Sequence, residues 1–153
     1  MSRPQPPLAR PPFFLYGTLL PGERNHPLLD GRTRSWTPAE LPGALLFDGP
    51  GRPYPYPYAL LDPAGGGTVH GEVAEVVPER YDEVLADLDL LEGYVPQGPP
   101  DCYERVLLTV RTADGPVEAW AYLAVDGLAR DLLRTGTPIT GGDWRRRTRP
   151  WSP

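Results

Sequence analysis

The position of Glu92 in the sequence favours acid-base chemistry. It continues an apolar stripe of helical spacing that Tyr81, Leu85 and Leu88 form. A carboxylate on a stripe that faces the core must be paired or lie in a cavity, and the C-terminal end of a helix also disfavours its negative charge. Both effects raise the pKa of Glu92 above that of a free glutamate, as a general acid or base near neutral pH requires. If the helix instead ends by Leu91, Glu92 points to water.

The other acids of the same helix have positions typical of solvated charges. Asp82, Glu83, Asp87 and Asp89 fall off the centre of the apolar stripe. Charged side chains in such positions normally face solvent. Glu92 is therefore the acid of this helix that we expect to point inward.

A second candidate for chemistry is the Gly17-Thr18 break in an apolar run from Phe13 to Leu20. Phe13 to Tyr16 are apolar enough for a buried strand, and Gly17 permits backbone angles that other residues avoid. A strand that ends in a glycine turn can present consecutive backbone N–H groups to an anion or to a carbonyl oxygen. The alternative is a strand that runs into an ordinary loop.

Composition excludes several other kinds of chemistry. A net charge of −5 argues against a general nucleic-acid binder. All fifteen basic residues are arginine, which excludes Schiff-base lysine chemistry and the P-loop lysine. His26 and His70 have no third ligand in a recognisable pattern, so we expect no metal site. Cys102 has no evident base beside it, which favours an inert thiol over a nucleophile.

The 153 residues are most simply one domain between two tails. Residues 1–12 form a proline-rich tail that we expect to be disordered, residues 13–144 form the domain, and residues 145–153 form a basic tail. The basic tail is expected to be solvated or docked on the domain rather than bound to RNA. No apolar run approaches the ~18 residues of a membrane helix, and the single cysteine gives no sign of an oxidising compartment, so we expect a cytoplasmic protein.

Turn residues divide the chain into short strands around one well-defined helix. Strands are predicted over 33–36 and 44–47, separated by Pro38 and Pro42, and over 68–77, 103–112 and 117–125. The last two are joined by a hairpin-like turn over 113–116, and Gly71 leaves room for close packing on its face of the strand over 68–77. A helix is predicted over 78–91 and a second short helix over 128–134. Tyr54 to Leu60 alternates tyrosine and proline, which favours an extended segment at a sheet edge, as a cleft wall or as a surface loop. These elements predict an α+β fold, with a small, mostly antiparallel, barrel-like sheet and a few flanking helices.

Six short motifs follow one another along the chain. They are Leu15-Tyr16-Gly17-Thr18-Leu19, Val69-His70-Gly71-Glu72-Val73, Leu88-Asp89-Leu90-Leu91-Glu92-Gly93-Tyr94, Tyr103-Glu104-Arg105, Ala119-Trp120-Ala121-Tyr122 and Gly142-Asp143-Trp144. Together and in this order they resemble the gamma-glutamylcyclotransferase-like family of the AIG2-like, or gamma-glutamylamine cyclotransferase, type. The resemblance covers most of the chain from Phe13 to about Trp144. It implies a small, barrel-like α+β fold with a cavity.

The resemblance also implies a reaction, the intramolecular aminolysis of a γ-glutamyl amide. The α-amino group attacks its own γ-amide carbonyl, closes 5-oxoproline and releases an amine or amino acid, with Glu92 as base and then acid. Tyr103 or Tyr122 is expected to supply a hydroxyl near the cleft, or else to be a core tyrosine. The resemblance implies no metal or organic cofactor, and its partner is a small γ-glutamyl molecule rather than nucleic acid or a membrane. The residues implied to hold the substrate are Tyr16, Gly17, Thr18 and Leu19.

Two alternatives belong to other functional classes. One is a non-catalytic module on the same fold that binds a small ligand between the loop and the helix. The other is an interaction protein that works through Tyr54 to Tyr58. A carboxylate at Glu92 favours the enzyme, because it is costly beside an apolar stripe and repels an anionic ligand. The leaving group and the oligomeric state do not follow from this sequence.

Overall fold

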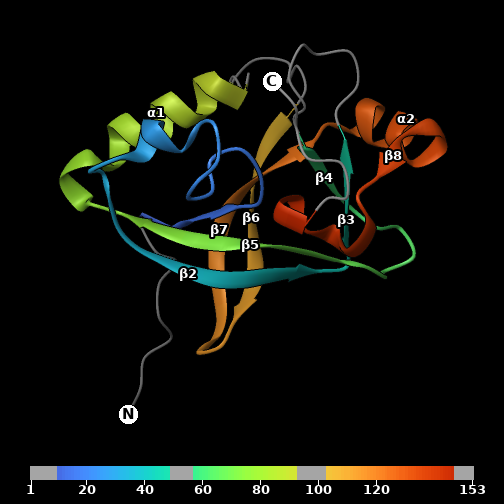
Figure 1. Cartoon of the computed structure of the whole chain (residues 1–153), viewed down its shortest axis with the longest axis horizontal. Helices are drawn as coiled ribbons and strands as arrows, with labels where there is room; N and C mark the ends of the chain where they lie inside the picture. The colour runs from blue at the N-terminus through green and yellow to red at the C-terminus, as the bar shows by residue number, and fades with distance from the viewer. Residues whose placement is uncertain (1–9, 49–56, 93–102, 147–153) are drawn as a thin grey trace.

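The computed structural model describes residues 10–48, 57–92 and 103–146. Five strands close into a barrel in the order β1-β5-β2-β6-β7, with α1 lying across it (Figure 1). The barrel strands are β1 (Phe13–Leu15), β2 (Thr33–Pro42), β5 (Thr68–Val76), β6 (Tyr103–Thr112) and β7 (Gly115–Ala124). The predicted α+β class with a mostly antiparallel, barrel-like sheet is confirmed.

One parallel contact closes the barrel. Neighbouring strands pair antiparallel around the ring, whereas β1 pairs with β7 in parallel through Phe13 and Trp120. Gly71 of β5 allows β1 to come close, since a Cβ there would collide with the carbonyl oxygen of Leu15. The close packing predicted at Gly71 is therefore confirmed, and it holds the end of β1, where the next turn starts, against β5.

A second, three-stranded sheet lies beside the barrel in the order β4-β3-β8. It consists of β3 (Ala44–Asp48), β4 (Pro57–Leu61) and β8 (Thr137–Pro138), and α2 (Asp126–Thr135) lies next to it (Figure 1). β4 is an edge strand, a position that suits its single proline, so the predicted edge position is confirmed for Pro57 to Leu60 and the surface loop is excluded there. Tyr54 to Tyr56 lie outside the described residues.

The prediction of a short strand ending at Trp36 is wrong, because β2 runs on through Pro38 to Pro42. Pro38 faces Glu72 of β5 on one side, and β2 pairs with β6 only at Ala39 and Glu40. Within the described residues, Pro38 therefore lies at a position where β2 pairs with a neighbouring strand on one side only. A proline needs no hydrogen-bond acceptor at such a position. The predicted strands over 68–77 and 103–112 and the hairpin that joins β6 to β7 are confirmed.

The helix predicted over 78–91 is a 3-10 turn, η2 (Pro78–Arg80), followed by α1 (Tyr81–Glu92). Tyr81, Val84 and Leu88 are buried against the outside of the barrel, together with Phe13 and Leu15 of β1. A separate core of alternate residues fills the barrel interior, and it includes Phe14, Val69, Val73 and Val110. The C-terminal end of α1 is thereby fixed above the strand that leads to Gly17.

The ends of the described chain join the fold. Pro11 and Pro12, which the sequence places in the N-terminal tail, are buried, and the carbonyl oxygen of Pro12 accepts a hydrogen bond from the Trp120 N–H at 2.9 Å. Short 3-10 helices, η1 (His26–Leu29), η3 (Thr140–Gly142) and η4 (Trp144–Arg146), complete the structure. Arg145, predicted to begin the basic tail, belongs to η4. The division into a domain and two tails otherwise stays a prediction.

Candidate active site

The turn after β1 is shaped by a close contact at Gly17. A Cβ on Gly17 would collide with the ring of Pro57 in β4, so only glycine fits here without displacing that strand. The N–H of Leu20 donates to the carbonyl oxygen of Gly17 at 3.1 Å, which closes the turn. The Gly-Thr break therefore forms a tight turn between the barrel and the smaller sheet.

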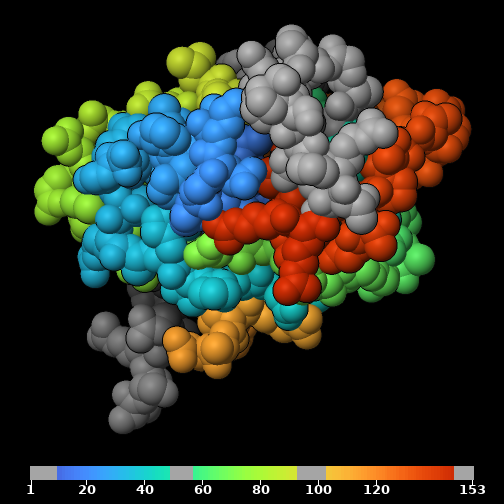
Figure 2. Space-filling model, in the orientation of Figure 1, coloured from blue at the N-terminus to red at the C-terminus, as the bar shows by residue number. Residues whose placement is uncertain are grey.

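Side chains from two other segments fix the rest of this turn. The Asn25 amide donates to Thr18 Oγ1 at 2.9 Å, and His26 Nδ1 lies 2.9 Å from the carbonyl oxygen of Leu19. From η4, the indole N–H of buried Trp144 donates to Glu23 at 2.8 Å, and Arg145 donates to the carbonyl oxygen of Pro21 at 2.9 Å. Figure 2 shows this C-terminal segment, in red, against the blue residues of the turn.

The backbone N–H groups at the tip of the turn have a different status. Among the described residues, no hydrogen bond uses the N–H groups of Gly17, Thr18 or Leu19. Their carbonyl oxygens do have partners: those of Gly17 and Thr18 accept backbone hydrogen bonds, and that of Leu19 lies within hydrogen-bond distance of His26 Nδ1. A buried N–H without a partner is unfavourable unless water or a ligand satisfies it. The turn thus presents consecutive donors, which suits a carboxylate or a developing oxyanion.

The prediction that Asp89 faces solvent is wrong. Its carboxylate is buried, with 8% of the residue exposed, and it pairs with Arg105 on β6 through Nε and Oδ1 at 2.9 Å. The helix lies against the outside of β6 and β7, so a flank position of the stripe is covered as well as its centre. Glu92, one turn later, is partly buried and lines a cavity, and the predicted exposure at a frayed helix end does not occur.

Three tyrosines surround the same cavity, and each donates its hydroxyl proton to the protein. Tyr16 donates to the carbonyl oxygen of Tyr122 at 2.5 Å, and Tyr122 donates to Asp89 Oδ1 at 2.6 Å. Tyr103 donates to the carbonyl oxygen of Pro57 at 2.7 Å. Tyr103 and Tyr122 are thus both buried core residues and cavity residues, so the two predicted alternatives hold together.

We name this space the inner cavity. It measures about 20 Å³, enough for one water molecule. Burial raises the pKa of the Tyr16 and Tyr122 hydroxyls, and the nearby negative charge of Glu92 raises both further. The carboxylate therefore lies close to both hydroxyls. The lining residues, which include all seven predicted site residues, are Phe14, Leu15, Tyr16, Gly17, Thr18, Leu19, Pro57, Glu92, Tyr103 and Tyr122.

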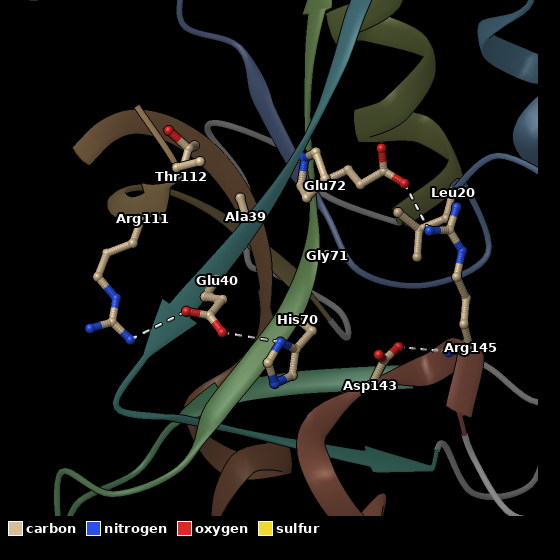
Figure 3. A pocket seen from close by; sticks show the side chains of 12 residues that line it. Leu20, Ala39, Glu40, His70, Gly71, Glu72, Arg111, Thr112, Asp143 and Arg145 are labelled. Carbon is tan, nitrogen blue, oxygen red and sulfur yellow. Dashed lines mark hydrogen bonds and ion pairs between the residues drawn. The ribbon is translucent and has the colours of Figure 1, made fainter. Parts of the chain in front are cut away.

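A larger space, the outer hollow, lies on the outside of the barrel along β2 and β5 and measures about 690 Å³ (Figure 3). Its charged side chains pair with one another. Glu40 lies 3.4 Å from His70 and 3.5 Å from Arg111, and Glu72 lies 2.8 Å from Arg145. The lining residues are Leu20, Pro38, Ala39, Glu40, His70, Gly71, Glu72, Arg111, Thr112, Ala113, Asp143 and Arg145.

Sequence reasoning missed the residues that support the inner cavity. Asp89, Arg105, Asn25 and Trp144 each hold a residue of the cavity wall or of its turn. The hairpin turn offered one signal, since its register places Arg105 opposite Tyr122. Within the described residues, no three His, Cys, Asp or Glu side chains gather where they could hold a metal ion.

Comparison with known proteins defines the class. The family model for gamma-glutamyl cyclotransferase, AIG2-like, matches residues 13–146, and the chain belongs to that family of enzymes. The Drosophila melanogaster protein CG2811, whose name assigns it provisionally to the gamma-glutamylcyclotransferases, is 32% identical over 136 residues, or 78% of this chain and 76% of that protein. The resemblance read from the six motifs is therefore confirmed.

A bacterial enzyme and a solved structure extend the comparison. Gamma-L-glutamyl-butirosin B gamma-glutamyl cyclotransferase of Niallia circulans is 34% identical over 116 residues, or 74% of this chain and 66% of that enzyme. The crystal structure of YkqA from Bacillus subtilis matches with a TM-score of 0.62 and 27% identity over 88% of this chain, which spans 39% of YkqA. In the part of the chain that the structure describes, no helix is both long and apolar enough to cross a membrane.

Proposed function

We propose that this protein cleaves a γ-glutamyl amide by intramolecular aminolysis, with Glu92 as the general base and acid. The observation that carries the proposal is that Glu92 and the Gly17–Leu19 turn line the same inner cavity. A carboxylate that accepts protons and a row of N–H donors are the two groups that this reaction needs. The membership of the chain in the cyclotransferase family supports the same assignment.

The turn binds the anionic part of the substrate in this proposal. The N–H groups of Gly17, Thr18 and Leu19 donate hydrogen bonds either to the α-carboxylate or to the oxygen of the γ-carbonyl, where negative charge develops. Holding the flexible glutamyl chain folded brings its α-amino nitrogen close to its own γ-carbonyl carbon. Because Gly17 packs against Pro57, the turn has little room to move on that side.

Glu92 moves one proton between the two nitrogens. Once the α-amino group is neutral, its nitrogen forms a bond to the γ-carbonyl carbon and gives a proton to the Glu92 carboxylate. The protonated Glu92 then donates that proton to the amide nitrogen, the carbon–nitrogen bond breaks, and 5-oxoproline and the free amine leave. General acid-base catalysis of this kind contributes about 10²–10⁴ in rate.

The inner cavity must widen to admit a substrate. Its volume of about 20 Å³ holds a single water, whereas a γ-glutamyl group is several times larger. We therefore expect the wall side chains to shift on binding. The name of the Niallia circulans enzyme supports a γ-glutamyl amide as the substrate class, and the leaving amine stays undetermined.

Mass spectrometry of 5-oxoproline tests the proposal. The full chain is incubated with γ-glutamyl amines, γ-glutamyl amino acids and glutathione, in parallel with the Glu92→Gln variant, which keeps the shape of the side chain but exchanges no proton. We expect 5-oxoproline from the wild type and a large loss in the variant. Full turnover by Glu92→Gln would refute the role of Glu92, and absence of product with every γ-glutamyl compound would refute the reaction. A cytoplasmic location stays a prediction.

A further inference from the structure

Asp89 is the most deeply buried acid among the described residues, and the proton transfers proposed above do not use it. Its Oδ1 receives two hydrogen bonds, from Tyr122 Oη at 2.6 Å and from Arg105 Nε at 2.9 Å. Arg105 and Tyr122 are direct partners across the β6–β7 hairpin, so both side chains rise from one face of the barrel toward α1. Three elements therefore converge on one carboxylate.

The direction of the hydrogen bond at Tyr122 is determined by this arrangement. The guanidinium of Arg105 can only donate, and its Nε and a terminal N–H donate to the two oxygens of the Asp89 carboxylate, which is the acceptor in this pair. A phenol has one proton, and Tyr122 donates its proton to Asp89. Toward the inner cavity, Tyr122 Oη can therefore offer only lone pairs. Tyr16 also donates its proton within the protein, to the carbonyl oxygen of Tyr122, and its oxygen in turn accepts from the Ala59 N–H at 3.4 Å.

Two kinds of polar group line the inner cavity. The Gly17–Leu19 turn has N–H donors, whereas Glu92 and Tyr122 have acceptors. A ligand group that binds these two acceptors must carry several N–H donors, and it gains from positive charge beside Glu92. The α-amino group of an amino acid has this chemistry, and its α-carboxylate suits the N–H groups of the turn.

We propose that Tyr122 accepts a hydrogen bond from the α-amino group of the substrate, and that Asp89 is a positioning residue that holds Tyr122 in this role. The proposal rests on the proposed function for the identity of the substrate. In this proposal Asp89 does more than anchor α1 through its pair with Arg105. Its carboxylate also accepts the hydrogen bond from the Tyr122 hydroxyl, whose single proton could otherwise point toward the ligand. Glu92 lies one helical turn beyond Asp89 and faces the same amino group.

Binding measurements in the Glu92→Gln background separate this inference from turnover. The probes are γ-glutamyl-n-butylamide and the monobutylamide of glutaric acid, which lacks only the α-amino group. Calorimetry measures both dissociation constants for the protein with Tyr122 and Asp89 unchanged, for Tyr122→Phe, for Asp89→Asn and for the double variant. The compared ratio is the dissociation constant of the ligand without the amino group divided by that of the amino ligand. Tyr122→Phe keeps the buried ring, so we expect it to fold even where an Asp89 variant does not, and thermal melting checks each variant.

The proposal predicts a particular pattern of ratios. Tyr122→Phe should weaken the amino ligand about tenfold or more and change the ligand without the amino group less than about twofold, because one charge-assisted hydrogen bond is lost. Asp89→Asn should lower the same ratio when Tyr122 is present and leave it unchanged in the Tyr122→Phe background. A purely structural role for Asp89 would weaken both ligands alike and would add to the effect of Tyr122→Phe.

Each outcome distinguishes this inference from the proposed function. If wild type forms 5-oxoproline but Tyr122→Phe leaves the ratio unchanged, the inference falls and the cyclotransferase reaction stands. If no 5-oxoproline forms but the ratio changes as predicted, the amino subsite stands and the reaction falls. If neither probe binds and no product forms, both are wrong.

Discussion

The outer hollow encloses about 690 Å³ and the inner cavity about 20 Å³, yet their polar groups are arranged in opposite ways. In the outer hollow, partly exposed acids and arginines neutralise one another, as Glu40 does with Arg111. In the inner cavity, buried partners fix the direction of each hydroxyl, and the N–H groups of the turn have no partner among the described residues. Polar groups that are already held in place favour catalysis more than a large volume does, because they need not rearrange as charge develops in the transition state.

The largest contrast between the two regions should come from a pair of glutamates. Glu92→Gln should lower kcat/KM by about 10²–10⁴, whereas Glu40→Gln should change it less than about twofold, because a surface ion pair contributes little. Release of 5-oxoproline from a γ-glutamyl amide measures both. Equal losses in the two variants would show that the outer hollow takes part in the reaction as much as the inner cavity does.

The next largest effect is expected at the turn. Gly17→Ala places a methyl group against Pro57 and must displace the Gly17–Leu19 N–H groups, so we expect kcat/KM to fall about 10²-fold, the usual cost of a misplacement near 1 Å. Gly127→Ala in α2 is the matched control, since a Cβ there meets no atom within 4 Å. It should leave activity unchanged and keep or raise the melting temperature. Normal activity in Gly17→Ala would exclude the turn from substrate binding.

Alkaline pH should affect the inner cavity selectively. Burial raises the pKa of Tyr16 and Tyr122, and Glu92 raises it further, so the folded state favours their neutral forms. Their contribution to stability is complete below the unfolded pKa of about 10 and is lost as the pH rises above it, at about 1.4 kcal/mol per pH unit for each tyrosine.

Urea unfolding of wild type and Tyr122→Phe at pH 9, 10 and 11 measures this loss. The chain has eight tyrosines and no lysine, so the other groups that titrate in this range are mainly the remaining tyrosines, which both proteins share. We expect the stability of the variant to fall less steeply above pH 10. Identical slopes would mean that Tyr122 ionises as readily in the folded protein as in the unfolded chain.

The smallest effect is expected at Arg145, which belongs to both regions. It pairs with Glu72 in the outer hollow and donates to Pro21 in the turn beside the inner cavity. Arg145→Gln should lower kcat/KM by about two- to fivefold and the free energy of unfolding by less than about 1 kcal/mol, because the side chain is partly exposed. A loss as large as that of Gly17→Ala would show that the outer hollow controls the turn.

Local patterns in the sequence predicted the parts of the site that are continuous in the chain. Helical spacing identified Glu92, the glycine break identified the turn, and the family motifs connected the two with Tyr103 and Tyr122. The hairpin and the strand over residues 68–77 followed from alternation and turn residues. These features depend on neighbours in the sequence, which is why they could be predicted.

Features that depend on tertiary contacts were missed. Periodicity measures the centre of the buried stripe and not how far the covering strands extend, so Asp89 was assigned to solvent although Arg105 and Tyr122 lie over it. The strand that begins at Thr33 was predicted to end before Pro38. The sequence does not show that β6 pairs with β2 only beyond Pro38, which is why the proline can lie within the strand. The contacts of Trp144 with the turn join residues from opposite ends of the described chain.

The parallel contact between Phe13 and Trp120 has a consequence for protein synthesis. β1 leaves the ribosome first, but its partners Ala74 and Trp120 emerge only when half and then most of the chain has been translated. Pairing over such separations is slow and costs loop-closure entropy. The turn that follows β1 therefore acquires its shape late, and a nascent chain that stops before β7 should have no catalytic competence.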